Sequence, residues 1–238
     1  MINGKTILAI ITARAGSKGL PRKNIMDLCG KPLITWSIEA GLASKFVDEV
    51  MVSTDSEEIA DVACQAGASI PYIRPAQLAT DTATSVDVIK HAVSFYENTL
   101  QKHYDYIILL EPTSPLREKD DIDSMLEKIT DLDKDFDAIV SLGEVHEHPS
   151  IMKKVANKEI SAYCDDLVIT SRRQDNDVAF FPYGVAYIVK TKTLFDENTI
   201  YPKRTTYHII KRYQCYEIDD YYDFLAIENV MKHEWSIR

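Results

Sequence analysis

The chain has 238 residues, of which 45% are hydrophobic and 27% are charged, proportions typical of a globular protein with one large α/β domain. Its formal net charge of −10 argues against a broad nucleic-acid-binding surface, because such a surface needs a basic face. The sequence contains no apolar run of about 18 residues and no secretory signal pattern, so we expect a cytoplasmic chain without membrane contact.

Short apolar runs alternate with longer amphipathic runs, an order typical of a mostly parallel sheet with helices on both faces. The pattern predicts strands at residues 7–11, 49–53, 106–110, 138–142 and 184–189. It predicts helices at residues 33–43, 57–66, 86–100, 120–132 and 221–233. We therefore expect a three-layer α/β/α fold that forms a single domain over residues 1–238.

Residues 143–181 interrupt this alternation. The segment is more polar than its surroundings and contains no long helical pattern. We expect short strands and loops, inserted into the domain as an arm that serves dimerisation or closes a site.

The segment after the first predicted strand carries the strongest chemical signal. Its sequence is ARAGSKGLPRKN at residues 13–24, and it follows a strand end, where open α/β sheets bind ligands. Gly16 and Gly19 allow the backbone to approach phosphate oxygens, and Ser17 adds a hydroxyl donor. Positive charge around this turn comes from Arg14, Lys18, Arg22 and Lys23.

This basic stretch contrasts with the acidic chain. Residues 1–31 contain six lysines and arginines but one acid, Asp27. A solvated basic loop is the alternative, and the glycine spacing after a strand favours a phosphate site. The pattern is neither GxxxxGK[ST] nor GxGxxG, which argues against a P-loop hydrolase and a dinucleotide-binding fold.

The loop resembles the amino-terminal motif of CMP-sialic acid synthetases, the acylneuraminate cytidylyltransferases, including relatives that act on legionaminic or pseudaminic acid. Further segments agree in the same order along the chain. They are VSTD at 52–55, RPAQLATDTATS at 74–85, LLEPTSPLR at 109–117, RRQD at 172–175 and EIDDYYDF at 217–224. The resemblance covers nearly the whole chain and implies an α/β/α fold like that of nucleotide-diphospho-sugar transferases.

The resemblance also implies roles for residues in a CTP site. The triphosphate would be held by Arg14, Gly16, Ser17, Lys18 and Lys23, with Asn24 close to the nucleotide. Cytosine and ribose would be recognised by Arg74, Ser85 and the backbone near Ala83. For Arg74, a surface arginine before Pro75 is the alternative.

The last segment resembles the family's metal-binding IDxxxD motif and implies a Mg²⁺ site. Asp219 is the expected ligand with Glu217 beside it, because residues two apart in an extended segment face the same way. Carboxylate oxygens suit Mg²⁺, which keeps waters and bridges substrate phosphates. Capping of the following helix is the alternative role for Asp219 and Asp220. We expect Arg14, Lys23 and Asp219 to carry catalysis.

The resemblance places the acceptor sugar near the middle of the chain. It implies sugar contacts from Glu111, Arg172, Arg173, Gln174 and Tyr187. One of the two adjacent arginines would bind the sugar's carboxylate through two parallel hydrogen bonds.

Three positions differ from the usual sialic acid enzymes. Glu111 stands where they have glutamine, Tyr183 where they have asparagine, and Phe181 where they often have a basic residue. An amide donates and accepts hydrogen bonds, whereas an ionised carboxylate only accepts them. We interpret these differences as favouring a modified nonulosonic acid such as legionaminic or pseudaminic acid.

The resemblance implies that the sugar's anomeric hydroxyl attacks the α-phosphorus of CTP and that pyrophosphate leaves. It also predicts a homodimer, as does the arm at 143–181. One alternative is a nucleotidyltransferase for another sugar such as Kdo, and the RRQD segment argues against it. A second alternative is a catalytically silent nucleotide-binding protein, and Lys23 and Asp219 argue against that.

Overall fold

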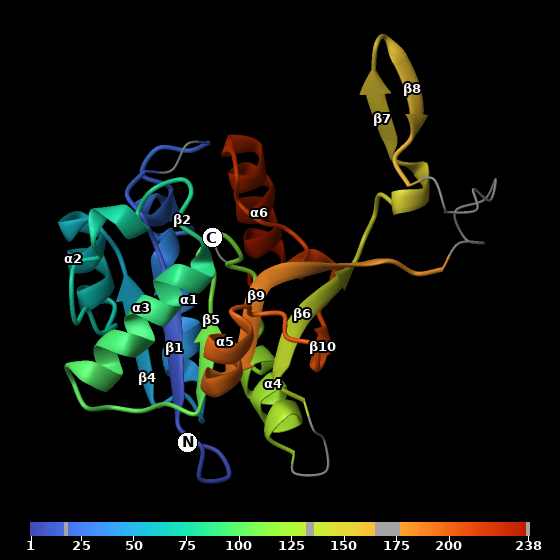
Figure 1. The fold of residues 1–238 in the computed structure, drawn as a ribbon. Coiled ribbons are helices and arrows are strands. Elements are labelled where there is room, and N and C mark those ends of the chain that lie inside the picture. Colours follow the sequence, from blue (N-terminus) through green and yellow to red (C-terminus); the bar gives the residue numbers. More distant parts are fainter. Residues whose placement is uncertain (17–18, 132–135, 165–176, 237–238) are drawn as a thin grey trace.

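A six-stranded sheet with the order β10-β6-β9-β5-β1-β4 forms the centre of the computed structural model (Figure 1). The structure describes residues 1–16, 19–131, 136–164 and 177–236. The strands are β1 (Ile7–Thr12), β4 (Glu49–Ser53), β5 (Tyr106–Leu109), β6 (Ala138–Glu144), β9 (Phe180–Lys190) and β10 (Thr205–Ile209). Only β9 runs antiparallel to its neighbours in this sheet, which confirms the mostly parallel arrangement.

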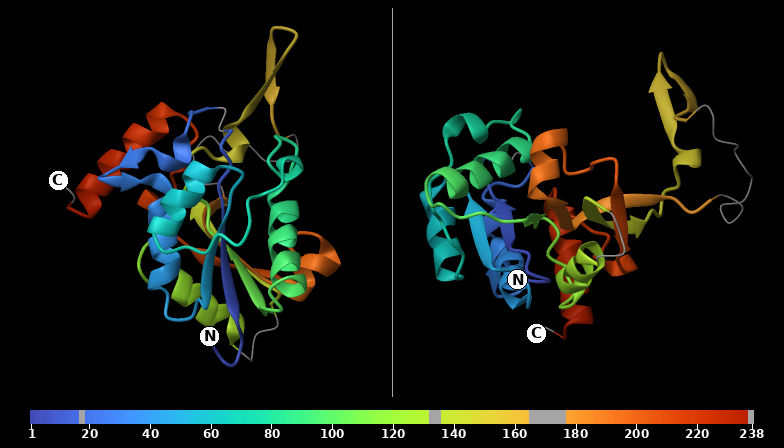
Figure 2. Two further views of the ribbon diagram at one scale, coloured as in Figure 1. Left: turned by 90° about the vertical axis from the view of Figure 1, so that its left-hand side faces the viewer. Right: turned by 60° about the horizontal axis from the view of Figure 1, so that its bottom comes forward.

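Helices cover both faces of the sheet (Figure 2). One face carries α1 (Leu33–Ala43), α2 (Glu57–Gln65) and α4 (Asp121–Thr130), and the other carries α3 (Ser85–Asn98) and α5 (Thr191–Glu197). Alternation along β1 explains this division, because Ile7, Ala9 and Ile11 pack with the first group. The intervening Leu8 and Ile10 pack with the second group. The predicted three layers are therefore confirmed.

The last helix, α6 (Tyr221–Glu234), packs away from the central sheet. Its Phe224, Ile227 and Met231 form a separate cluster with Leu28 and Leu33, beside the hairpin of β2 (Asp27–Leu28) and β3 (Lys31–Pro32). Short 3₁₀ helices are η1 (Lys23–Ile25), η2 (Ala76–Leu78), η3 (Pro149–Ile151) and η5 (Arg212–Gln214). Among the described residues, no helix has the length and apolar character needed to cross a membrane.

Capping boxes fix the starts of two helices. In α3, Thr84 Oγ1 accepts a hydrogen bond from the Asp87 backbone N–H at 3.1 Å, and Asp87 accepts one from the Thr84 N–H. In α6, Asp220 Oδ1 accepts from the Asp223 N–H at 3.0 Å, and Asp223 accepts from the Asp220 N–H. Each cap is worth about 1 kcal/mol. Asp220, rather than Asp219, is thus the capping residue of α6.

The segment between β6 and β9 differs in extent from the predicted insertion. Because the β6–β9 pairing reaches Glu144 and Phe180, both strands extend beyond their predicted ends. Between them, β7 (Lys153–Ala156) and β8 (Glu159–Ala162) form a hairpin that projects away from the sheet (Figures 1 and 2). The strand β10 and the helix α5 were not predicted.

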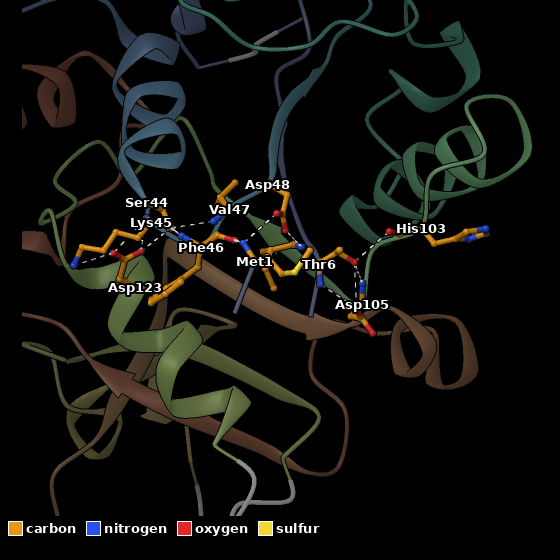
Figure 3. A network of polar contacts seen from close by, with 11 residues as sticks. Met1, Thr6, Ser44, Lys45, Phe46, Val47, Asp48, His103, Asp105 and Asp123 are labelled. Carbon is orange, nitrogen blue, oxygen red and sulfur yellow. Dashed lines mark hydrogen bonds and ion pairs between the residues drawn. The ribbon is translucent and has the colours of Figure 1, made fainter. Parts of the chain in front are cut away.

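Aspartates stabilise the loops at the amino-terminal edge of the sheet (Figure 3). Asp48 accepts a hydrogen bond from the Ile7 N–H at 2.7 Å, and Asp105 accepts one from the Thr6 N–H at 2.9 Å. Both contacts join the start of β1 to the start of a neighbouring strand. They fix the relative positions of β1, β4 and β5, whose opposite ends carry the site described next.

Candidate active site

A cavity of about 340 Å³, here called the central cavity, opens where β1 and β5 end. Its lining comes from three separate parts of the sequence: the basic loop after β1, the turn after β5 and the segment before α6. The residues that line it are Thr12, Arg14, Gly19, Lys23, Asn24, Glu111, Pro112, Thr113 and Asp219. The predicted site residues Arg14, Lys23, Asn24, Glu111 and Asp219 therefore meet in one cavity.

Lys23 and Asp219 lie side by side in the central cavity. The distance between Lys23 Nζ and Asp219 Oδ1 is 3.5 Å, and Lys23 Nζ donates a hydrogen bond to the Ile218 carbonyl at 2.5 Å. On its other side, the Ile218 N–H donates to the Thr113 carbonyl at 2.8 Å. Ile218 thus connects the basic loop to the turn after β5. The Lys23 side chain is 12% exposed and the Asp219 side chain 85%, so the carboxylate is the accessible member.

The two glycines of the basic loop have different surroundings. A Cβ atom at Gly19 would lie 2.3 Å from the Asp219 carbonyl oxygen, whereas nothing in the described structure lies within 4 Å of a Cβ at Gly16. The need for glycine at position 19 comes from contact with protein backbone. Ser17 and Lys18, between them, lie outside the described residues.

Asn24 and Asp55 hold the backbone around Arg14. Asn24 is buried, and its Nδ2 donates to the Arg14 carbonyl at 3.1 Å. Asp55 Oδ1 accepts from the Ala15 N–H at 2.9 Å. The Arg14 guanidinium forms an ion pair with Asp81, with 2.8 Å between Nη1 and Oδ1.

A second cavity of about 220 Å³, here called the side cavity, shares Thr12 and Arg14 with the central cavity. Its remaining lining comes from Arg74 and the segment that leads into α3. These residues are Arg74, Leu78, Thr80, Asp81, Ala83, Thr84, Ser85 and Val88. The structure thus brings together the three residues predicted for cytosine and ribose recognition.

Arg74 is a buried cation in the wall of the side cavity, and not a surface arginine. Its Nε donates to Ser53 Oγ at 3.0 Å, and its Nη2 donates to the Ser53 carbonyl. Burial lowers the pKa of the Arg74 guanidinium. These hydrogen bonds anchor the side cavity to the end of β4.

Glu111 lies at the end of the central cavity nearest β9. Burial raises the pKa of its carboxyl to about 7, the Glu217 carboxylate adds to the rise, and Arg117 opposes it. A Cβ at Gly184 would stand 2.4 Å from Glu111 Oε2 and 2.8 Å from Glu111 Cβ, so a larger residue there would displace this carboxyl. Glu217 Oε1 accepts hydrogen bonds from Ser114 Oγ at 2.9 Å and the Gly184 N–H at 2.7 Å. Glu217 does not line the central cavity.

Arg117 holds the backbone around Glu111 in place, a role that the sequence did not reveal. Its buried guanidinium donates to the carbonyls of Glu111 at 2.7 Å, Gly184 at 2.8 Å and Val185 at 2.5 Å. Arg117 therefore ties the end of β5 to β9. The RRQD residues Arg172, Arg173 and Gln174 lie outside the described residues.

Tyr187 does not line the central cavity, whereas Thr12 does. Tyr187, predicted to bind sugar, is buried against Tyr201, with ring centroids 5.8 Å apart, and does not line the central cavity. Thr12 was not predicted, although it lines both cavities. Its position two residues before Arg14, on the same side of the strand end, is the signal that would have identified it.

The acids of the central cavity suit a metal ion that is shared with a substrate. Mg²⁺ is usually held by one or two carboxylates, with waters and substrate phosphates completing its shell. Asp219 and Glu111 are the carboxyl groups of this lining. Within the described ranges, no group of three or more His, Cys, Asp and Glu residues forms a closed metal site. The donor set fits an ion that arrives with a phosphate-bearing ligand.

A larger groove of about 510 Å³ lies elsewhere, between α1 and the segment that leads into α4. Trp36 and Trp235 line it, with Glu39, Glu118 and Asp120 as its acids. Arg117 and Lys119 are its basic residues, so the lining has no excess of positive charge for a triphosphate, and the groove contains none of the predicted site residues. The two smaller cavities are therefore the candidate active site.

Comparison with known proteins extends these observations. Residues 8–233 match the family described as cytidylyltransferase. The chain is 34% identical over 237 residues to the N-acylneuraminate cytidylyltransferase of Streptococcus agalactiae serotype III, covering 97% of this chain and 54% of that protein. It is 34% identical to the pseudaminic acid cytidylyltransferase of Campylobacter jejuni, covering 95% of this chain and 97% of that protein. The CMP-N,N'-diacetyllegionaminic acid synthase of Legionella pneumophila is also 34% identical, and the match covers 95% of this chain and 96% of that protein.

The chain spans about half the length of the Streptococcus relatives and nearly the full length of the other two. A solved CMP:2-keto-3-deoxy-manno-octonic acid synthetase in complex with CTP has the same fold, with a TM-score of 0.69 at 18% identity over 96% of this chain and 99% of that one. A 4-diphosphocytidyl-2C-methyl-D-erythritol synthase from Anaerococcus prevotii gives a TM-score of 0.67 at 13% identity, over 97% of this chain and 100% of that one. With a family match that runs from β1 into α6, the chain belongs to the cytidylyltransferase family.

Proposed function

We propose that this chain is a CMP-nonulosonate synthetase, which transfers CMP from CTP to the anomeric hydroxyl of a sialic-acid-like sugar and releases pyrophosphate. The observation that carries the proposal is the meeting of Lys23 and Asp219 in one cavity that shares Thr12 and Arg14 with a second. Two adjacent cavities suit a ligand with a nucleoside at one end and a triphosphate at the other. The names of the relatives support nonulosonic acids as the sugar class.

In this proposal the nucleoside occupies the side cavity. Arg74, Ser85 and the backbone at Ala83 surround it, and the small volume favours a pyrimidine over a purine. The triphosphate lies in the central cavity, where Arg14 and Lys23 counter its charge. Gly16, Ser17 and Lys18 of the same loop supply further donors, as the family motif implies.

Catalysis follows from charge that develops on the phosphoryl oxygens and on the departing pyrophosphate. Arg14 and Lys23 stabilise that charge from fixed positions, which is the main contribution of proteins to phosphoryl transfer. Asp219 would hold Mg²⁺, and Glu217, which lies outside the lining of the central cavity, is the second ligand that the family motif implies. When bound, the ion neutralises phosphate charge and orients the triphosphate.

The acceptor sugar lies toward Glu111 in this proposal. Arg172, Arg173, Gln174 and Tyr187 are the further sugar contacts implied by the family motif. The differences at Glu111, Tyr183 and Phe181 favour a modified nonulosonic acid. A homodimer in the cytoplasm belongs to the same proposal, and the projecting β7–β8 hairpin is the surface that supports it.

The test is to incubate the protein with CTP, Mg²⁺ and a panel of N-acetylneuraminate, legionaminate, pseudaminate and Kdo, and to measure pyrophosphate and the CMP-sugar. Turnover with one or more of the first three sugars is expected. Turnover with Kdo alone would assign a different acceptor. CTP binding without turnover of any of the sugars would contradict the proposal in favour of a silent nucleotide-binding protein.

A further inference from the structure

The ion pair between Arg14 and Asp81 lies at the wall between the two cavities. The distance from Arg14 Nη1 to Asp81 Oδ1 is 2.8 Å. Arg14 lines both cavities, whereas Asp81 lines only the side cavity. The pair therefore links the basic loop after β1 to the segment that enters α3, about 70 residues later in the sequence.

The backbone at Arg14 is already held in place. Asn24 Nδ2 donates to its carbonyl at 3.1 Å, and the next N–H, that of Ala15, donates to Asp55 at 2.9 Å. The long arginine side chain, which is 33% exposed, is the part that these backbone contacts do not hold. Fixing such a side chain costs conformational entropy, and a carboxylate partner that holds it before the ligand arrives lowers the cost of binding.

We propose that Asp81 is a positioning residue, which holds the Arg14 guanidinium at the junction of the two cavities for contact with the α-phosphate of the nucleotide. The inference rests on the proposed function, because the α-phosphate joins the nucleoside of the side cavity to the triphosphate of the central cavity. A guanidinium has five N–H donors, so a carboxylate at Nη1 leaves donors for a phosphate oxygen. Asp81 itself touches Arg14 and not the reacting atoms.

The test compares Asp81→Ala with Asp81→Asn by calorimetric titration of CTP and of cytidine, which has no phosphate. Asp81→Ala is expected to weaken CTP binding about tenfold, roughly the loss of one charge-assisted contact. Cytidine binding is expected to change by less than about twofold, because Arg14 would act on phosphate. Asp81→Asn is expected to bind CTP within about threefold of the wild type, since its amide oxygen still accepts from Arg14.

Two controls test whether Asp81 acts through Arg14 or through a general effect of losing an aspartate. In an Arg14→Ala background, Asp81→Ala is expected to cause a smaller loss of CTP affinity than in the wild-type background. Asp61→Ala, which removes an exposed aspartate on α2, is expected to leave both titrations unchanged. Equal losses for CTP and cytidine would overturn the inference by showing a general role in the shape of the side cavity.

Tighter CTP binding by Asp81→Asn or Asp81→Ala would also overturn it, because it would show that the carboxylate competes with phosphate for Arg14. Failure of the wild-type protein to bind CTP would instead count against the proposed function. Wild-type binding of CTP with an unchanged Asp81→Ala titration would remove the inference alone.

Discussion

Gly19 lies directly against the backbone of Asp219, and a Cβ atom at Gly19 would stand 2.3 Å from the Asp219 carbonyl oxygen. The contact joins the basic loop after β1 to the segment before α6, and both residues line the central cavity. The opposing atom belongs to the backbone, so it cannot rotate away as a side chain can. The approach of the loop to the acid therefore depends on a glycine at position 19.

Gly19→Ala is expected to separate the basic loop from Asp219 and to lower kcat/KM for CTP by roughly 100-fold, the effect of a misplacement of about 1 Å. Gly16→Ala is the matched variant, and we expect a smaller loss because its Cβ meets open space in the described structure. Steady-state pyrophosphate release measures both. Equal losses would show that the contact with Asp219 is not what requires glycine.

Asp219→Ala is expected to lower magnesium-dependent turnover by about 10² to 10³-fold, the usual cost of removing a charged group from a phosphoryl-transfer site. The side chain is 85% exposed, so the free energy of unfolding should change by less than about 0.5 kcal/mol. Asp220→Ala is the control and should lose about 1 kcal/mol of stability as a helix cap while keeping most of its turnover. Unchanged rates of Asp219→Ala at limiting Mg²⁺ would remove Asp219 from the site.

Glu111→Gln is expected to change how stability depends on pH. Burial, then Glu217, raises the carboxyl pKa from 4.5 to about 7 in the folded chain. Between those values the folded chain binds more protons here than the unfolded chain, so deprotonation destabilises the fold as pH rises. Glutamine removes this loss, which amounts to at most about 3 kcal/mol at high pH.

Urea unfolding of wild type and Glu111→Gln, at about pH 5 and about pH 8, measures this difference. The variant's advantage should be larger at the higher pH. Glu127→Gln, at an exposed position on α4, should show no such trend. An advantage of the same size at both pH values would mean that Glu111 titrates near its ordinary value.

Val155→Asp and Ile160→Asp are expected to dissociate the proposed homodimer. The two residues pair across the β7–β8 hairpin and are 76% and 73% exposed, an unusual position for large apolar side chains. Light scattering after size exclusion measures the mass. Lys153→Asp on the same hairpin adds an acid without removing apolar surface and should leave the dimer intact. A monomeric wild-type protein would contradict the prediction.

The sequence predicted the elements with a strong periodic pattern, and its motifs named residues that the structure brings together in two cavities. Helix α1 and strand β4 have their predicted bounds, because apolar runs between polar turns determine both. Lys23 and Asp219 were expected to meet, and they lie 3.5 Å apart at the nearest charged atoms. Their separation of about 200 residues in the chain was bridged by family motifs and not by periodicity.

Other features had no pattern to reveal them. Arg117 acts through the carbonyls of Glu111, Gly184 and Val185, and any residue type can supply a carbonyl. The predicted metal pair of Glu217 and Asp219 assumed that residues two apart face the same way, whereas Ser114 and Gly184 bind one Glu217 oxygen. Such differences arise from tertiary contacts, which spacing of two residues does not encode.

The backbone of Ile218 accepts a hydrogen bond from Lys23 Nζ and donates one to the Thr113 carbonyl. These contacts affect the order in which the parts of the cavity come together during folding. The basic loop is made early during synthesis, yet its lysine gains this partner only after Ile218, 195 residues later, has emerged. Long-range closure of this kind is slow relative to local folding. Nascent chains that end before Ile218 should therefore lack this contact and be inert in pyrophosphate release.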